Sequence, residues 1–128
     1  MEPIPDSHRD LLEGRFVTLA TVGAAGRPQQ SVVWFLAEGN AVKMSLNSSR
    51  QKTRNLQRNP VCSLLIADPA NPYRYLELRG TAKVEADPDY SFANQIGTKF
   101  GDFPHKRDRP GETRVVVTVV PDRARAVG

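Results

Sequence analysis

The feature that most constrains the fold is a series of short β-branched and apolar runs separated by tight turns. The runs cover residues 15–22, 29–37, 41–47, 61–67, 73–85 and 113–120. Most connections between them are too short to carry the chain back along a sheet, so consecutive strands must pair antiparallel. The sequence therefore predicts a mainly β protein with some α-helix, built on about six antiparallel strands that form a closed or nearly closed barrel.

Three segments between or before these runs have helical signals. Residues 6–13 predict a short helix that Asp6 or Ser7 caps and Gly14 ends. A second helix is expected over about 50–59. The dipeptide Asp87-Pro88 predicts the start of a third helix, with Pro88 in its first position, which runs to about residue 100. We expect these two to three helices to pack on the rim or ends of the barrel.

The length of 128 residues predicts a single domain over residues 1–128. No stretch approaches the roughly 18 to 20 apolar residues of a membrane span. Residues 1–6 lack the basic start and apolar core of a secretion signal. The one cysteine, Cys62, sits in an apolar run and is expected to be a buried thiol. These features together favour a cytoplasmic protein.

The charge points to an anionic partner, since 18 Lys and Arg against 14 Asp and Glu give a net charge of +4. The aromatic residues are not interleaved with basic ones, and no helix-turn-helix or zinc-ligand spacing occurs, so a small anionic ligand is favoured over nucleic acid. Two histidines and one cysteine speak against a structural metal site. His8 and His105 have no obvious catalytic partner nearby and are expected on the surface.

The segment 45–55 carries the strongest signal for a ligand. Ser48 and Gln51 have the spacing of a capping box, which predicts a helix start just after Ser48 or Ser49. Arg50 and Lys52 then fall in the first turn, where the helix dipole disfavours cations unless an anion is nearby. This pattern predicts a phosphate site. A solvated basic helix is the alternative from spacing alone, and it is the favoured interpretation for Arg54 and Arg58.

Four sequence blocks in order carry a resemblance to a known family. The blocks are residues 19–21 (LAT), 26–29 (GRPQ) leading into 33–35 (VWF), 50–56 (RQKTRNL) with Pro60 after it, and 75–82 (YLELRGTA). Together they resemble the split β-barrel flavin-binding family typified by pyridoxamine 5′-phosphate oxidase. The compact length and the KTRN block are similar to its branch of reductases that depend on the deazaflavin coenzyme F420.

The resemblance implies a homodimer with the cofactor in a groove at the subunit interface. Arg50 and Lys52 would hold the cofactor phosphate with Ser49 and Asn55 nearby. Ser45, Leu46 and Asn47 would line the ribityl chain and the ring edge. On the neighbouring strand, Gln29, Ser31 and Val33 would face the ring system, and Tyr73 would approach from the partner. The implied cofactor-binding residues are Gln29, Ser31, Val33, Ser45, Leu46, Asn47, Ser49, Arg50, Lys52, Asn55 and Tyr73.

The activity that the resemblance implies is hydride transfer from reduced F420 to an unsaturated or conjugated small-molecule acceptor. No side chain is forced into an acid or base role, so no catalytic residue is assigned. An FMN-dependent oxidoreductase and a non-catalytic barrel that binds a cofactor, haem or a fatty acid remain alternatives. A nucleic-acid-binding barrel is a third alternative. For Trp34, a core or dimer-interface position is favoured over stacking on the cofactor ring.

Overall fold

The computed structural model describes residues 2–101 and 108–128. His105, which is expected on the surface, lies outside the described residues. The elements in chain order are η1 (Asp6–Glu13), β1 (Phe16–Val22), η2 (Ala24–Gly26), β2 (Pro28–Trp34), β3 (Leu36–Glu38), β4 (Ala41–Asn47), α1 (Gln51–Arg58), β5 (Val61–Asp68), β6 (Asn71–Ala86), α2 (Ser91–Phe100) and β7 (Arg114–Val127), where η marks a 3₁₀ helix. In this part of the chain, no helix combines the length and the apolar character that crossing a membrane requires.

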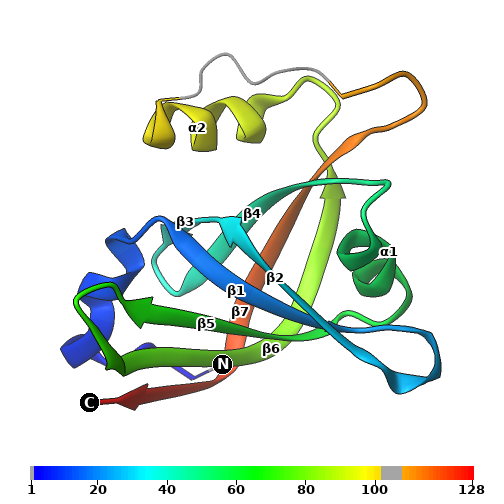
Figure 1. Ribbon diagram of the computed structural model, residues 1–128. Coiled ribbons are helices and arrows are strands. Elements are labelled where there is room, and N and C mark those ends of the chain that lie inside the picture. The colour runs from blue at the N-terminus through cyan, green and yellow to red at the C-terminus, as the bar shows by residue number, and fades with distance from the viewer. Residues whose placement is uncertain (1, 102–107) are drawn as a thin grey trace.

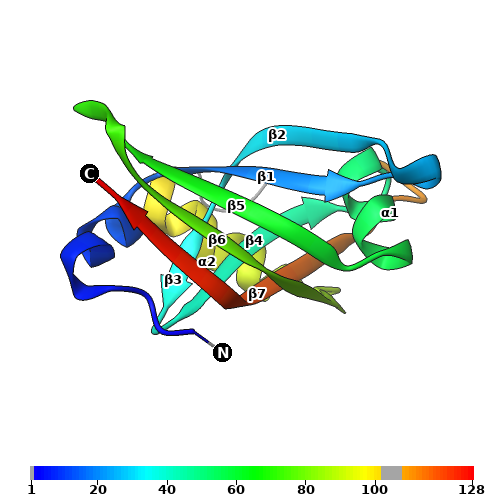
Figure 2. The same ribbon diagram turned by 90° about the horizontal axis from the view of Figure 1, so that it is seen from below.

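The strands form one curled sheet in the order β2-β1-β5-β6-β7-β4-β3, and every neighbouring pair is antiparallel. The sheet wraps into a half-barrel with α2 lying across one opening (Figure 1). The N-terminal helix η1 and α1 lie at opposite ends of the barrel in both views (Figures 1 and 2). The predicted fold class, mainly β with peripheral helices, is confirmed.

The sheet has seven strands where the sequence predicts about six, because the predicted strand 29–37 is broken at Phe35. Before the break, β2 pairs with β1, and Trp34 lies opposite Phe16. After it, Leu36 pairs with Lys43 of β4. The Phe35 side chain is fully buried, and the Lys99 ammonium donates a 2.9 Å hydrogen bond to its carbonyl oxygen. The chain therefore passes from one end of the sheet to the other and closes the barrel at this point.

The core lies inside the curl of the sheet and follows the alternation of each strand. On β4, Val42, Met44 and Leu46 are buried, while the residues between them face the other side. Leu11 and Leu12 of η1 are buried and close one end, and Gly14 ends that helix as predicted, with its N–H donating to the carbonyl oxygen of Leu11. Cys62 is buried as predicted, and burial raises the pKa of its thiol to about 11.

The predicted capping box of α1 is wrong. The helix begins at Gln51, its N-cap is Arg50, and no side chain caps it. The Ser48 hydroxyl instead accepts a 2.9 Å hydrogen bond from the backbone N–H of Thr113. The Gln51 amide donates to Asn55 Oδ1 at 2.7 Å. Because both side chains have other partners, the first turn of α1 keeps free backbone N–H groups.

The start of α2 also differs from the prediction. The helix begins at Ser91, and Pro88 lies in the preceding turn, where Tyr90 adopts a left-handed backbone with φ of 62°. Asp87 still caps the helix, because its carboxylate accepts hydrogen bonds from the N–H groups of Phe92 at 3.2 Å and Ala93 at 2.9 Å. The turn moves the first helical position from the predicted Pro88 to Ser91, three residues later.

The last strand, β7, is longer than the predicted run 113–120 and extends through Pro121. Pro121 lies opposite Gly80 where the register of β6 and β7 shifts, which marks a β-bulge. A proline is tolerated there because a bulge leaves a backbone N–H without a ladder partner. A Cβ on Gly80 would lie 3.0 Å from the carbonyl oxygen of Val120, so the close approach of the strands requires glycine.

Candidate functional site

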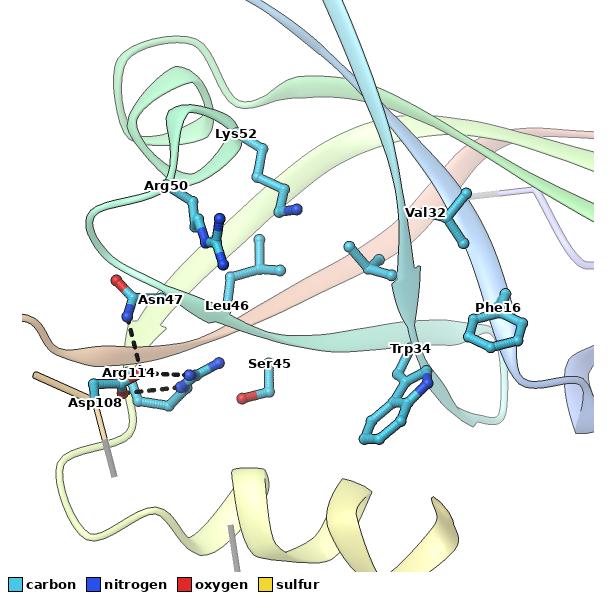
Figure 3. Close-up of a pocket in the computed structure, with 11 residues that line it drawn as sticks. Phe16, Val32, Trp34, Ser45, Leu46, Asn47, Arg50, Lys52, Asp108 and Arg114 are labelled. Carbon is cyan, nitrogen blue, oxygen red and sulfur yellow. Dashed lines mark hydrogen bonds and ion pairs between the residues drawn. The ribbon is translucent and has the colours of Figure 1, made fainter. Parts of the chain in front are cut away.

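A pocket of about 480 Å³ opens where β2 and β4 diverge, beside the start of α1 (Figure 3). This volume lies within the range of about 300 to 1,000 Å³ that small-molecule sites occupy. The opening exists because β3, and not β2, pairs with β4. The residues that line the pocket are Phe16, Val32, Val33, Trp34, Ser45, Leu46, Asn47, Arg50, Lys52, Asp108 and Arg114.

Six of the residues predicted from the sequence share this pocket. They come from β2, from β4 and from the start of α1, where Arg50 is the N-cap. The six are Val33, Ser45, Leu46, Asn47, Arg50 and Lys52. In Figure 3, Arg50 and Lys52 lie on the side of α1, and Leu46 forms the wall between them and Ser45.

Arg50 and Lys52 form a pair of cations without a carboxylate partner among the described residues. The Lys52 ammonium donates a 3.1 Å hydrogen bond to the Ser31 hydroxyl. Burial, and to a smaller extent the charge of Arg50, lower the pKa of Lys52. Two unpaired cations beside an uncapped helix start form a site that favours an anion such as phosphate.

Two predicted residues, Gln29 and Asn55, support α1 and do not line the pocket. Asn55 is buried, and its amide donates to the Thr21 hydroxyl at 3.0 Å. Thr21 in turn donates to Gln29 Oε1 at 3.0 Å. This chain of hydrogen bonds ties α1 to β1 and β2, so it fixes the helix that carries Lys52.

Ser49 also lies outside the pocket wall. Its hydroxyl donates to Asn47 Oδ1 at 2.7 Å and to Glu112 Oε2 at 3.0 Å. Hydrogen bonds from Asn47 and Ser49 lower the pKa of the Glu112 carboxyl. The side-chain amide of Asn47 therefore makes hydrogen bonds to other residues of the protein. Asn47 contributes to the pocket as part of its wall.

Tyr73 does not approach the pocket of its own chain. It lies near the start of β6 and is 81 % exposed. The expectation that it reaches the cofactor from a partner subunit stays a prediction.

The aromatic wall of the pocket was not predicted as such. Phe16 and Trp34 are opposite each other on β1 and β2, and Val32 lies next to them on β2. The Trp34 ring stacks on Phe100 of α2, with centroids 4.5 Å apart and an angle of 15° between the planes. The sequence favoured a core or interface position for Trp34, and the structure places it in the pocket wall. A prediction of the register of the β1–β2 hairpin would have placed Phe16 opposite Trp34.

Asp108 and Arg114 are the polar residues of the pocket that sequence reasoning missed. Arg114 donates to Asp108 through Nη2 at 2.5 Å and through Nε at 3.1 Å. Asp108 lies between α2 and β7, far along the chain from segment 45–55, and no local pattern marks it. Among the described residues, no group of three or more His, Cys, Asp or Glu side chains could hold a metal ion.

The pocket also holds a buried polar atom that lacks a partner. The Ser45 hydroxyl makes no hydrogen bond within the described part of the chain. Such a group costs about 1 to 3 kcal/mol unless something satisfies it. Together with the cations at the start of α1, which pair with no described carboxylate, this atom suits a polar ligand that carries an anionic group.

The chain belongs to the pyridoxamine 5′-phosphate oxidase family, which it matches over residues 4–128. This family of flavin-binding split β-barrels is the one that the four sequence blocks predicted. A comparison with curated proteins found no match.

Solved structures with the same fold include an F420 reductase, which is 32 % identical with a TM-score of 0.83, and the match covers 95 % of this chain and 98 % of that chain. A protein from Listeria innocua described as a putative pyridoxamine 5′-phosphate oxidase is 25 % identical with a TM-score of 0.75, over 94 % of this chain and 95 % of that one. A conserved hypothetical protein from Mycobacterium tuberculosis shares the fold at 22 % identity, with a TM-score of 0.77 over 97 % and 84 %.

Proposed function

We propose that residues 1–128 form one cofactor-binding domain that acts as an F420-dependent reductase. The observation that carries this proposal is the pair Arg50 and Lys52, which has no carboxylate partner among the described residues and lines a pocket with an aromatic wall. The two cations suit a phosphate on one part of a ligand, and the aromatic wall suits a flat ring on another part. When bound, the reduced deazaflavin would supply a hydride to an unsaturated or conjugated acceptor.

In this proposal, Arg50 and Lys52 hold the cofactor phosphate, and the Lys52 ammonium is placed for it by the bond to Ser31. Ser45, Leu46 and Asn47 line the path from the phosphate to the ring. Val33 faces the ring. Gln29 and Asn55 act through α1, and Ser49 acts through Asn47, because those are the groups that they contact.

The proposal includes a homodimer, because one face of the sheet carries apolar side chains that stay exposed in the part of the chain that the structure describes. Phe16 is 53 % exposed, Val32 63 % and Leu65 38 %. Val32 and Leu65 are both registered opposite Thr18, so they lie on the same face of β2, β1 and β5. A second copy on this face would cover it, border the pocket and bring a partner residue such as Tyr73 to the cofactor.

F420 is preferred to FMN because the F420 reductase structure resembles the chain at the higher identity, 32 % against 25 % for the Listeria innocua protein. An FMN-dependent oxidoreductase of the same fold, or a barrel that binds a cofactor without catalysis, are the competing functions.

The direct test is turnover. Reduced F420 is mixed with the protein and a panel of quinones and enones, and its oxidation is followed by the return of deazaflavin absorbance. We expect acceptor-dependent oxidation that Arg50→Ala and Lys52→Ala weaken and Arg54→Ala does not, because Arg54 is exposed on α1 away from the pocket lining. Tight binding without acceleration for any acceptor would support the non-catalytic barrel. Activity with FMN and oxygen in place of F420 would support the flavin oxidase.

A further inference from the structure

The guanidinium of Arg114 is held rigidly on the side of the pocket away from α1. Its two parallel bonds to Asp108 form a bidentate pair, in which the Arg114 side chain is 13 % exposed and that of Asp108 6 %. Asp108 is fixed in turn by the Tyr90 hydroxyl at 2.5 Å and by the Asn47 amide at 2.8 Å. The orientation of Arg114 is therefore set by Tyr90 just before α2, by Asn47 of β4 and by Asp108 in the segment before β7.

These bonds leave part of Arg114 unused. They engage Nε and Nη2, and the Nη1 amino group has no partner among the described residues. The unpartnered Ser45 hydroxyl is its neighbour, because Asn47 is registered opposite Arg114 and Ser45 lies two residues along β4 on the same face. In Figure 3 the free end of Arg114 and the Ser45 side chain lie together in the pocket. Two hydrogen-bond donors thus meet at a point where neither has an acceptor among residues 2–101 and 108–128.

The chemistry of this point differs from that of the phosphate site. Arg50 and Lys52 are not neutralised by a described carboxylate, so they suit a full anion. The charge of Arg114 is balanced by Asp108, so its free N–H groups suit an oxygen that is neutral in the ground state and gains charge during reaction. A carbonyl oxygen conjugated to a reducible carbon–carbon double bond has this property.

We propose that Arg114, positioned by Asp108 and assisted by Ser45, is a specificity-determining residue that binds the carbonyl oxygen of the hydride acceptor. This inference rests on the proposed reductase function. A bound reduced deazaflavin would supply the hydride that forms a C–H bond at the far carbon of the double bond, and the π electrons of the acceptor would shift to give an enolate oxygen. The Arg114 and Ser45 donors stabilise that oxygen. A proton from water then adds to the adjacent carbon, which leaves a saturated carbonyl compound and oxidised deazaflavin.

The test compares two acceptors in one enzyme. With an enone, Arg114→Gln is expected to lower kcat/KM by about 10- to 100-fold, the effect of losing a charged donor to a transition-state oxygen. With phenazine methosulfate, which has no carbonyl, kcat/KM stays within about twofold. The affinity for F420 also stays within about twofold. Arg54→Gln, an exposed arginine of α1, is the matched control and changes neither acceptor.

Ser45→Ala provides a second variant that leaves the Asp108 contacts in place, and we expect a smaller fall, about 3- to 10-fold, with the enone alone. If Arg114→Gln does not fold, Ser45→Ala decides the test. Equal losses with both acceptors, or a loss of F420 affinity, would overturn this inference and leave the reductase function standing. Absence of turnover by the wild-type protein with either acceptor would overturn the reductase function itself.

Discussion

The Lys52 ammonium and the Ser31 hydroxyl join α1 to β2 across the opening of the barrel, through a 3.1 Å hydrogen bond. The Asn55 amide makes a second connection, because it donates a 3.0 Å hydrogen bond to the Thr21 hydroxyl of β1. Since β2 is an end strand of the sheet and does not pair with β4, these contacts hold the two sides of the pocket at a fixed separation. The cation that we assign to the phosphate is therefore positioned before a ligand arrives, which reduces the ordering cost of binding.

Replacing Lys52 by Ala removes one of two unpaired cations and is expected to weaken F420 binding by about 10- to 100-fold, the range for a charged hydrogen bond of about 1.5 to 3 kcal/mol. Isothermal titration measures the dissociation constant. Arg58→Ala, on the exposed end of the same helix, is the control and leaves the constant within about twofold. An unchanged affinity in the Lys52 variant would show that the phosphate lies elsewhere.

The affinity for F420 is expected to fall at alkaline pH, starting below 10.5. The pKa of free Lys52 is lowered from this ordinary value by burial and by Arg50, and a bound phosphate raises it again. Affinity is therefore full at pH values below the pKa of free Lys52 and declines as pH rises through it. Lys52→Arg, whose guanidinium stays protonated, should keep a flat profile between pH 8 and about 11. A parallel decline in both proteins would assign the titration to another group.

Placing a charge on the exposed apolar face should separate the proposed dimer. Leu65→Arg puts a guanidinium on β5 opposite Thr18, where it would have to be buried without a partner. Light scattering is expected to give the monomer mass for this variant and twice that mass for the wild-type protein. Val120→Arg, at a 41 % exposed position on β7, serves as the control. A wild-type monomer would contradict the dimer.

Removing the charge of Asp108 should destabilise the fold. Asp108→Asn leaves Arg114 largely buried without its carboxylate, and breaking such a pair costs about 3 kcal/mol. Glu85→Gln, which breaks the exposed pair with Lys83, should cost less than about 1 kcal/mol. Denaturant unfolding measures both.

The dependence of the protein's stability on acid pH provides a second test of the Asp108–Arg114 pair. Burial alone would raise the pKa of Asp108, and the hydrogen bonds from Arg114 and Tyr90 outweigh it and lower the pKa below 3.8. Its contribution to stability is then present above pH 3.8 and lost as pH falls through the lowered pKa. The free energy of unfolding of the wild-type protein should therefore fall in acid by the contribution of Asp108. The Asp108→Asn variant lacks this contribution and should not show that fall. Equal stability of the two proteins at neutral pH would contradict the assignment.

The sequence predicted the strands and the residues next to one another along the chain, because periodicity and turns are local signals. It placed Arg50 and Lys52 beside Ser45 and Leu46 for that reason. It did not predict the contact of Asp108 with Arg114 and Tyr90, which depends on how α2 and β7 meet. His8, expected on the surface, is buried with Nε2 at 2.9 Å from the carbonyl oxygen of Val127. Such contacts follow from barrel closure, which no local pattern encodes.

The single tryptophan of the chain, Trp34, lines the proposed cofactor pocket and reports directly on what binds there. The most direct test of the central claim is a titration of its fluorescence with F420 and, separately, with FMN. We predict saturable quenching by F420 at concentrations at least about tenfold lower than FMN requires, a difference of about 1.4 kcal/mol. Tighter quenching by FMN, or no quenching by F420, would contradict the assignment of this pocket to a deazaflavin.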